Sequence, residues 1–400
     1  FSKGISGNLL CRSNSEFDED VRSVLTWPLV NQAVEEAMKA TSQDEPNPAE
    51  PDAAHVSQPA RALVEAGNKS QILFTMPCYV GNYQLAVSNA DNTIFTKHST
   101  LACKLVTSFS GNQQRTPAMP NIMANILLFS KQTGQLMCIM DGTQITAWRT
   151  AAASIVATKY LYFQRAVPTF QQRQIKVAII GCGVQGRAHA FGMCHTFDVS
   201  EVYLWNRTTS RAHKLAEDLR NASHGKTKAV KVQVTSTPAE AVADADIICV
   251  GTFASEALVE YDMLKKGDIH INTVGAGQVH FGEISNDIYT KAHVYVDSMA
   301  SAQIELKGLP ADIVDEVGSI ILKKSYPQEG CITIFQSLGK QYKYIFWTLE
   351  TKQKKKQFSS FMQEWVQKML LWHKLSLKLC KVKKGAVHEL KPNYTNKQIT

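Results

Sequence analysis

The sequence predicts an α/β protein in which a parallel-sheet domain stands beside a smaller α+β domain. Two observations lead to this prediction. Between residue 142 and about residue 330, short apolar runs alternate with helical stretches, which is typical of a parallel sheet with helices on both faces. Before residue 142, β-rich runs follow one another without intervening helices, so that part is expected to form a sheet of its own.

Length and composition limit the class of protein. The chain has 400 residues, more than one core usually supports, so we expect two domains. It contains no run of about 18 apolar residues, so neither a transmembrane helix nor a membrane partner is expected. Residues 1–20 lack the apolar core of a secretion signal, and the nine cysteines form no CxxC pair. These features favour a cytoplasmic protein with reduced thiols and no metal site.

The net charge of +8 is concentrated at the end of the chain. Residues 340–400 hold 14 lysines, no arginine, no aspartate and three glutamates, a net charge of +11, so residues 1–339 together carry −3. A nucleic-acid-binding function would therefore depend on that segment alone. We expect no nucleic-acid partner.

The first domain is expected to span residues 21–141. Residues 21–40 carry an apolar face at helical spacing, and residues 41–58, rich in proline, serine and aspartate, are expected to form a loop. Short β-rich runs then occupy residues 71–140, with residues 81–100 as an irregular insertion. A helix followed by a sheet is the pattern of an α+β domain.

The second domain is expected to span residues 142–330. Residues 141–163 are rich in alanine and have helical periodicity. Strands and helices alternate after them, as parallel sheets require. The expected strands lie within residues 176–183, 201–207, 232–236, 245–252, 270–276 and 294–298.

The clearest functional motif is KVAIIGCGVQGRAHA, residues 176–190, where an apolar strand leads directly into a glycine-rich turn and a helix. The first glycine permits the tight bend, the second lets a pyrophosphate approach the backbone, and the third lets helix and strand pack closely. The phosphates then meet free N–H groups at the helix N-terminus. The motif therefore predicts a Rossmann dinucleotide-binding domain, with a purely structural glycine turn as the alternative. The residues expected at the cofactor are Gly181, Gly183, Val184, Gln185 and Gly186.

The end of the next strand indicates which cofactor binds. An NAD-dependent enzyme usually places an aspartate or glutamate there, on the ribose 2′-hydroxyl. This chain instead has Asn206, Arg207 and Thr208. A guanidinium and a hydroxyl group can bind a 2′-phosphate, which a carboxylate would repel. We therefore expect NADPH, with NADH as the second choice; an ordinary solvated arginine is the alternative explanation for Arg207.

Several segments resemble the ornithine cyclodeaminase/mu-crystallin family over residues 21–339. They are MDGTQITAWRTAAASIVATKYL, GCGVQGRAHA, LWNRT, HINTVGA and FQSLG. Within the family, the chain is most similar to the animal mu-crystallin type, which comprises ketimine reductases. The first and last of these segments are more specific than the glycine turn.

The resemblance implies NADPH- or NADH-dependent reduction of small cyclic ketimines that carry a carboxylate, together with binding of thyroid hormone. It also implies a homodimer, formed by the N-terminal α+β domain (residues 21–141), which would bind the substrate. The Rossmann domain (residues 142–330) would follow, and residues 331–339 would return to the first domain.

The resemblance further implies roles for individual residues. Arg61, at the end of a QPAR string, would bind the substrate carboxylate through a bidentate fork. Lys104, at the start of KLV, would polarise or protonate the imine nitrogen, which makes the imine carbon a better hydride acceptor. Arg149 would lie near the cofactor phosphates or the substrate carboxylate. Without the resemblance, each would more often be a solvated surface charge. The further cofactor contacts implied are Thr252, Val274 and Leu338.

One departure from the family concerns the loop after VGA. Where cyclodeaminases and many relatives carry an aspartate, this chain has His280, in VGAGQVHFGEIS. The missing carboxylate disfavours an ornithine cyclodeaminase-type lyase. His280 is either an acid near neutral pH or a solvated loop histidine. A third alternative, besides reductase and lyase, is an NADPH-dependent hormone-binding protein without useful catalysis.

The end of the chain departs further. The family continues after SLG with a helix, whereas residues 340–400 here form a lysine-rich tail. Codons for residues 339–340 and 361–363 can supply splice-donor and splice-acceptor strings, and removal of the stretch between them shifts the reading frame. In the shifted frame, EWVQKMLLWHKLSLK can become GMGAEDAVVAQTK, the missing helix. We interpret the tail as a retained intron followed by a frameshift, which would leave NADPH binding intact and impair turnover or dimer stability. The alternative is a genuine basic appendage for a membrane or nucleic acid.

Overall fold

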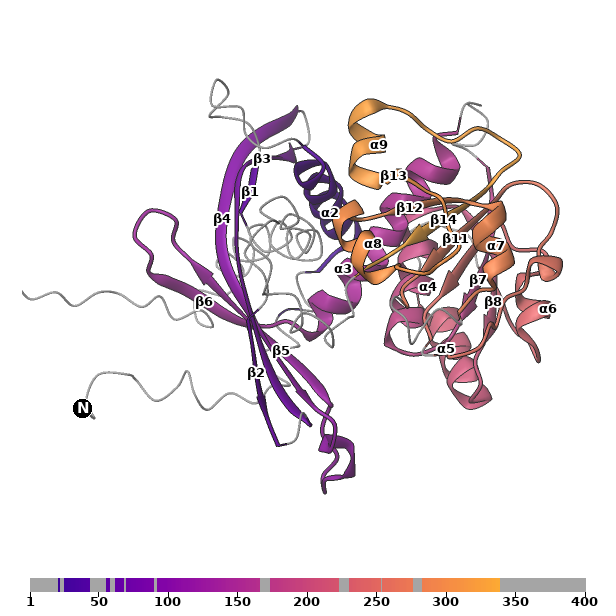
Figure 1. The fold of residues 1–400 in the computed structure, drawn as a ribbon, viewed down its shortest axis with the longest axis horizontal. Coiled ribbons are helices and arrows are strands. Elements are labelled where there is room, and N and C mark those ends of the chain that lie inside the picture. The colour runs from indigo at the N-terminus through magenta and orange to yellow at the C-terminus, as the bar shows by residue number, and fades with distance from the viewer. Residues whose placement is uncertain are drawn as a thin grey trace, which may run out of the picture.

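The computed structural model contains two β-sheets with a layer of helices between them (Figure 1). Helices α2 (Trp27–Thr41) and α3 (Thr143–Thr158) lie in that layer. The structure describes residues 21, 25–43, 55–57, 62–67, 70–89, 92–165, 173–222, 230–252, 254–275 and 283–338. Arg61, His280 and the tail from 340 to 400 lie outside these residues, so the expectations about them remain predictions.

The first sheet has six strands and is antiparallel throughout. Its order is β1-β3-β4-β5-β6, with β2 also paired to β3. One face is buried and the other is not: along β5, Ala124, Ile126 and Leu128 are buried while the residues between them are more exposed. The strands are β1 (His55–Ser57), β2 (Ala62–Ala66), β3 (Gln71–Asn89), β4 (Asn92–Phe109), β5 (Ile122–Phe129) and β6 (Leu136–Asp141).

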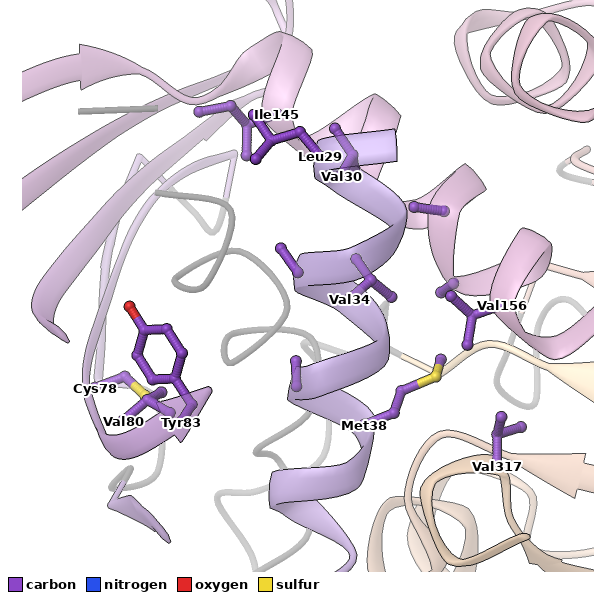
Figure 2. Close-up of a cluster of buried hydrophobic side chains, with 14 of the residues drawn as sticks. Leu29, Val30, Val34, Met38, Cys78, Val80, Tyr83, Ile145, Val156 and Val317 are labelled. Carbon is purple, nitrogen blue, oxygen red and sulfur yellow. The ribbon is translucent and has the colours of Figure 1, made fainter. Parts of the chain in front are cut away.

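Helix α2 covers the buried face of this sheet and supplies much of its core (Figure 2). Its apolar side chains recur at helical spacing, as predicted from residues 21–40, so Val30, Val34 and Met38 are all buried. They belong to one cluster with Tyr83 of β3 and Val317 of helix α9 (Val317–Lys323). The helix therefore joins the first sheet to a late segment of the chain.

Residues 81–100, expected as an irregular insertion, instead extend the sheet. Strands β3 and β4 pair along their whole length, with one shift in register between Val80 and Tyr83. At this shift Asn82 adopts a φ of 54°, which asparagine tolerates better than most residues. The buried Tyr83 hydroxyl then lies 2.7 Å from the Thr100 hydroxyl. The prediction was wrong because a bulge absorbs the break in the alternating pattern.

The second sheet has eight parallel strands in the order β13-β12-β14-β11-β10-β7-β8-β9. Side chains of β7 alternate between two cores: Val177 and Ile179 pack with α3, α4 and α5, whereas Ala178 and Ile180 pack with α6 and α7. This confirms the predicted parallel sheet with helices on both faces. The strands are β7 (Ile175–Ile180), β8 (Val199–Trp205), β9 (Lys231–Val234), β10 (Ile247–Val250), β11 (Ile269–Thr273), β12 (His293–Val296), β13 (Ile313–Glu316) and β14 (Ile332–Gln336). Among the described residues, the other helices and helical turns are α4 (Val184–Thr196), α5 (Thr209–Asn221), α6 (Pro238–Val242), α7 (Asn286–Lys291), α8 (Met299–Glu305), η1 (Asn112–Gln114), η2 (Lys159–Phe163) and η4 (Tyr261–Met263).

Strand β14 lies inside the second sheet, between β11 and β12. The expectation that residues 331–339 return to the first domain is therefore wrong for this strand. Its sequence, ITIFQ, is β-favouring and mostly buried, which is typical of an inner parallel strand. Contact with the first domain comes from Phe335, which joins the core around α2, and from α9. A Cβ on Gly318 would lie 2.0 Å from the Met38 carbonyl oxygen, so α9 packs tightly on α2.

Helix α3 belongs to both packing layers. Ala152, Ala153 and Val156 lie in the core of the first sheet, while Ala151 and Ile155 lie in the core on one face of the second. Its alanines are small enough to let neighbouring elements approach from every side. The helix thus packs against both sheets.

Two histidines are completely buried in the parallel-sheet domain. Burial lowers the pKa of His189 to about 4. Burial, together with the nearby Arg165 guanidinium, lowers the pKa of His270 to about 3. Both ring nitrogens of each histidine have hydrogen-bond partners. Both rings are therefore neutral at physiological pH.

We expect the free energy of unfolding to fall as the pH is lowered from about 7.5 to about 5. The pKa of each buried histidine is below the value of about 6.5 in an unfolded chain, so the unfolded chain binds more protons in this window. At pH 5 the loss should be about 2 kcal/mol for each ring. Thermal unfolding of the full chain at both pH values measures it. His189→Gln should remove about half of the pH dependence, and an unchanged dependence in this variant would contradict the assignment.

Candidate active site

The glycine-rich turn joins β7 to α4, as predicted, and its three glycines meet three different steric needs. Gly181 has a φ of +98°, and a Cβ there would lie 2.7 Å from the Gly251 carbonyl oxygen. A Cβ on Gly186 would lie 1.8 Å from the Gly181 carbonyl oxygen, so only glycine lets the helix approach the turn. A Cβ on Gly183 would meet nothing within 4 Å. The space beside Gly183 is therefore open to a ligand.

The other predicted cofactor residues follow the carboxyl ends of neighbouring parallel strands. These ends are level, because Ile180 of β7 pairs with both Trp205 of β8 and Val250 of β10. In an open parallel sheet, this edge is where ligands bind. The structure thus brings the residues predicted from separate segments to one edge. They are the glycine turn after β7, Asn206, Arg207 and Thr208 after β8, Thr252 after β10, Val274 after β11 and Leu338 after β14.

Asn206 ties the glycine turn to the loop after β8. Its Oδ1 accepts a hydrogen bond from the Cys182 N–H at 2.8 Å, and its Nδ2 donates to the Thr208 carbonyl at 2.9 Å. Arg207 and Thr208 are exposed where α5 begins. No acidic residue stands between β8 and α5. The position that a carboxylate occupies in NAD-dependent enzymes is therefore held by an amide, with a guanidinium next to it.

Glu283 organises this edge of the sheet and was not among the residues predicted from the sequence. Only 1% of its surface is exposed. Its Oε1 accepts hydrogen bonds from the N–H and the hydroxyl of Thr252, at 2.6 and 3.1 Å, and its Oε2 accepts one from the Gly275 N–H at 2.9 Å. The carboxylate thereby ties together the loops after β10 and β11. The one hint of this role in the sequence is that Glu283 stands in the stretch FGEI. A carboxylate that is buried there needs partners, because unpaired buried carboxylates are rare.

Gln336 of β14 holds the other side of Gly275. Its Nε2 donates to the Gly275 carbonyl at 2.8 Å, and its Oε1 accepts from the hydroxyls of Thr273 and Tyr289, at 2.5 and 2.7 Å. Burial raises the pKa of Tyr289, so its hydroxyl stays protonated and donates. The loop after β11 is therefore fixed through both the N–H and the carbonyl of one residue.

The residues at this edge fit a dinucleotide. The Oε1 of Gln185 is buried and accepts no hydrogen bond from the rest of the described chain, so it is available to a ligand donor. Helix α4 has no acidic residue in its first turn, so its free N–H groups favour an anion. Together with the open space beside Gly183, these features suit a pyrophosphate flanked by hydrogen-bonding sugars.

Lys104 is buried between the first sheet and α3. It pairs with Met76 and Ile126 in the middle of the sheet, and only 3% of its surface is exposed. Its Nζ donates to the Thr146 hydroxyl at 3.1 Å, and that hydroxyl donates to the Gly142 carbonyl at 2.7 Å. The bland alternative, a solvated surface lysine, is therefore excluded. A buried ammonium is costly, which makes Lys104 a candidate for function.

Arg149 lies one helical turn beyond Thr146 on α3, and 6% of its surface is exposed. Residues three apart on a helix share a face, so Arg149 approaches the same side of α3 as Lys104. Two buried cations on one side of a helix suit an anionic group such as a carboxylate. Arg61, the third predicted cation, lies outside the described residues.

Within the described ranges, no group of three or more His, Cys, Asp and Glu side chains could hold a metal ion. No helix in this part of the chain is both long and apolar enough to cross a membrane.

The sequence matches the model of the ornithine cyclodeaminase/mu-crystallin family over residues 19–347. The chain belongs to this family. The resemblance inferred from the quoted segments over residues 21–339 is thereby confirmed.

Relatives include proteins named as a ketimine reductase and as a pyrroline-2-carboxylate reductase. Ketimine reductase mu-crystallin from Rattus norvegicus is 34% identical over 291 residues, which cover 71% of this chain and 80% of the relative. Delta(1)-pyrroline-2-carboxylate reductase from Bacillus cereus is 31% identical over 252 residues, which cover 60% and 72%.

Solved structures share the fold at lower sequence identity. Delta(1)-pyrroline-2-carboxylate reductase from Thermococcus litoralis, solved with NADH and L-proline, has a TM-score of 0.66 and 22% identity, covering 91% of this chain and 96% of that one. An archaeal alanine dehydrogenase dimer with bound NAD has a TM-score of 0.64 and 22% identity, covering 90% and 95%. These matches confirm the predicted α/β fold.

Proposed function

We propose that the protein reduces the C=N bond of small cyclic ketimines that carry a carboxylate, with NADPH as the hydride donor. The observation that carries this proposal is the burial of Lys104 beside α3, in a chain whose dinucleotide turn is sterically intact. A protein that only binds a nucleotide has little use for a buried ammonium, whereas C=N reduction needs a proton donor. Relatives named for ketimine and pyrroline-2-carboxylate reduction support the proposal.

In this proposal the chain supplies a proton and orientation. Lys104, oriented by Thr146, donates a proton to the imine nitrogen, which makes the imine carbon electrophilic. A nicotinamide cofactor supplies the hydride that the carbon accepts. One hydride and one proton add across the double bond, and the product is a cyclic amine carboxylate. Arg149 and Arg61 would bind its carboxylate.

Oxidation of NADPH by the purified full chain, with a six-membered cyclic ketimine carboxylate as substrate, tests the proposal. We expect ketimine-dependent loss of NADPH and no release of ammonia. Ammonia release from ornithine without net use of cofactor would instead indicate a cyclodeaminase-type lyase. Saturable thyroid-hormone binding without NADPH oxidation would indicate a binding protein.

We expect NADPH to be preferred to NADH, because Arg207 and Thr208 are exposed where a 2′-phosphate would lie. Arg207→Ala should raise the KM for NADPH about tenfold or more and leave the KM for NADH within about twofold. Steady-state kinetics with both cofactors measure the two values. Lys214→Ala removes an exposed charge from α5, the helix that begins two residues after Arg207, and serves as the control. An equal rise in the KM for NADPH and the KM for NADH would contradict the assigned role of Arg207.

We also propose a homodimer formed through the outer face of the first sheet, which is turned away from α2. Apolar side chains continue across neighbouring strands on this face, where Cys103 pairs with Leu127 and Leu127 with Ile139. Leu101 and Phe129 form the adjacent pair, and Ile139 is 40% exposed. A continuous apolar patch of this kind marks a contact surface. The dimeric state of the archaeal structural relative supports this proposal.

A charge on this face should prevent dimer formation. Ile139→Asp is expected to convert a dimer of the full chain to a monomer, because an unpaired carboxylate would be buried at the contact. Light scattering coupled to size-exclusion chromatography measures the mass. Val314→Asp, at a 47% exposed apolar position on β13, is the matched control and should leave the mass unchanged. A monomeric mass for a chain in which the family-type ending GMGAEDAVVAQTK replaces residues 339–400 would refute the proposed dimer.

A further inference from the structure

A chain of buried hydrogen bonds runs through the parallel-sheet domain towards the glycine turn. It begins at Arg165, whose Nη2 donates to the Thr333 hydroxyl at 2.7 Å. Thr333 lies 2.8 Å from His270 Nδ1, and His270 Nε2 lies 3.1 Å from Asn272 Oδ1. Asn272 Nδ2 then donates to the hydroxyl of Thr158, on α3, at 3.0 Å. This series of hydrogen bonds thus leads from the second sheet to α3, the helix that packs against both sheets.

Each residue in this series of hydrogen bonds donates to the next one, from Arg165 to Thr158. Because Asn272 donates through its amide nitrogen to Thr158, its oxygen accepts from the N–H at Nε2 of His270. The Nδ1 of His270 then accepts from the Thr333 hydroxyl. The Thr158 hydroxyl donates onward to the Ser154 carbonyl at 2.7 Å. Aligned donors polarise one another and strengthen each bond.

The Ser154 hydroxyl and His189 form a separate link between α3 and α4. The Ser154 hydroxyl lies 2.8 Å from His189 Nε2, and His189 Nδ1 lies 2.8 Å from the Gln185 carbonyl. A carbonyl can only accept, so Nδ1 carries the proton and Nε2 accepts from Ser154. Both residues are fully buried, at 0% and 2% exposure, and the neutral ring is held in one tautomer.

The place of Gln185 gives this contact its importance. It lies in the first turn of α4, which begins directly after Gly183 and the open space beside it. An apolar side chain could fill the position of His189 without the cost of burying an imidazole. The histidine instead fixes that turn to α3, and α3 also contacts Lys104 through Thr146.

We propose that Ser154 and His189 are positioning residues, which hold the phosphate-binding turn of α4 at a fixed place against α3. They couple the first turn of α4, which faces the cofactor, to α3, which contacts the proposed substrate residue Lys104 through Thr146. This inference rests on the proposed function, because it requires a nucleotide at the glycine turn. Neither residue needs to touch the cofactor.

Ser154→Ala tests the proposal with the smallest change. It removes one hydroxyl and leaves His189 Nε2 without its donor. We expect the Kd for NADPH, measured by nicotinamide fluorescence on the full chain, to rise about fivefold, the effect of one buried hydrogen bond. The KM for NADPH should rise with it, while kcat at saturating cofactor stays within about twofold of wild type. His189→Gln, which keeps an acceptor for Ser154 but loses the donor to Gln185, should weaken NADPH binding as well.

Tyr162→Phe is the matched control. It removes a buried hydrogen bond to Asp246, 3.2 Å long, at the opposite edge of the same sheet. It should lower the melting temperature but change the Kd for NADPH by less than about twofold. An equal rise in Kd in this control would show a general effect of destabilisation and overturn the proposal. Unchanged Kd values in Ser154→Ala and His189→Gln would overturn it and leave the proposed function standing. A wild-type chain that binds no NADPH would overturn both.

Discussion

Replacement of Lys104 by methionine is expected to lower kcat for ketimine reduction about 100-fold or more, the usual contribution of a general acid. Methionine has a similar length and keeps the packing between β4 and α3, so the change removes the charge rather than the volume. Because the ammonium is buried, its removal should not lower the free energy of unfolding. The Kd for NADPH should also be unchanged.

Three measurements on the full chain test this expectation: kcat, the melting temperature and the Kd for NADPH. Lys131→Met changes an exposed lysine in the turn between β5 and β6 and provides the control. Thr146→Val keeps the size of the side chain but removes the acceptor of Lys104 Nζ, so an intermediate loss of kcat is expected. If Lys104→Met kept more than about one tenth of wild-type kcat, the role as proton donor would be wrong.

Two alanine substitutions in the glycine turn are expected to have different effects, one on the free energy of unfolding and the other on NADPH binding. In Gly186→Ala the new Cβ would lie 1.8 Å from the Gly181 carbonyl oxygen, so α4 must move away from β7. We expect this to cost about 3 kcal/mol or more of the free energy of unfolding. In Gly183→Ala the new Cβ meets no atom within 4 Å, so the fold should be unaffected. Its methyl group would stand where the pyrophosphate approaches, and the Kd for NADPH should rise at least about tenfold.

Urea unfolding and NADPH titration of both variants separate these two roles. Gly111→Ala, at an ordinary turn position in the first domain, should change neither quantity. Unweakened NADPH binding by Gly183→Ala would show that the turn is not the phosphate site. Wild-type stability of Gly186→Ala would show that the contact between α4 and the turn is looser than described.

The glycine turn could be predicted from the sequence because the strand, the three glycines and the helix follow one another directly. The Gly186 contact lies within the turn, whereas the Gly181 contact is with Gly251 and Thr252 after β10, and the space at Gly183 is open. Asn206 and Arg207 followed from the same logic, since the next parallel strand must end beside the turn. For Lys104, by contrast, spacing alone said nothing about burial, and the family resemblance singled it out.

Three features that the sequence did not predict depend on contacts between distant residues. Strand β14 enters the middle of the sheet because its neighbours β11 and β12 accept it there, and no local pattern specifies that order. Glu283 acts on Thr252, which is 31 residues away, and Ser154 meets His189 across 35 residues. Their residue types are common in loops and helices, so only the folded arrangement shows what they do.

The most direct test of the proposed reaction is the transfer of deuterium from NADPH labelled at C4 of its nicotinamide ring. The full chain would be mixed with this cofactor and a six-membered cyclic ketimine carboxylate, and the product analysed by mass spectrometry. A reductase yields a cyclic amine carboxylate with deuterium on the former imine carbon, and Lys104→Met forms it far more slowly. An unlabelled product would contradict the proposed hydride transfer, and so would a ketimine left unchanged by a chain in which GMGAEDAVVAQTK replaces residues 339–400.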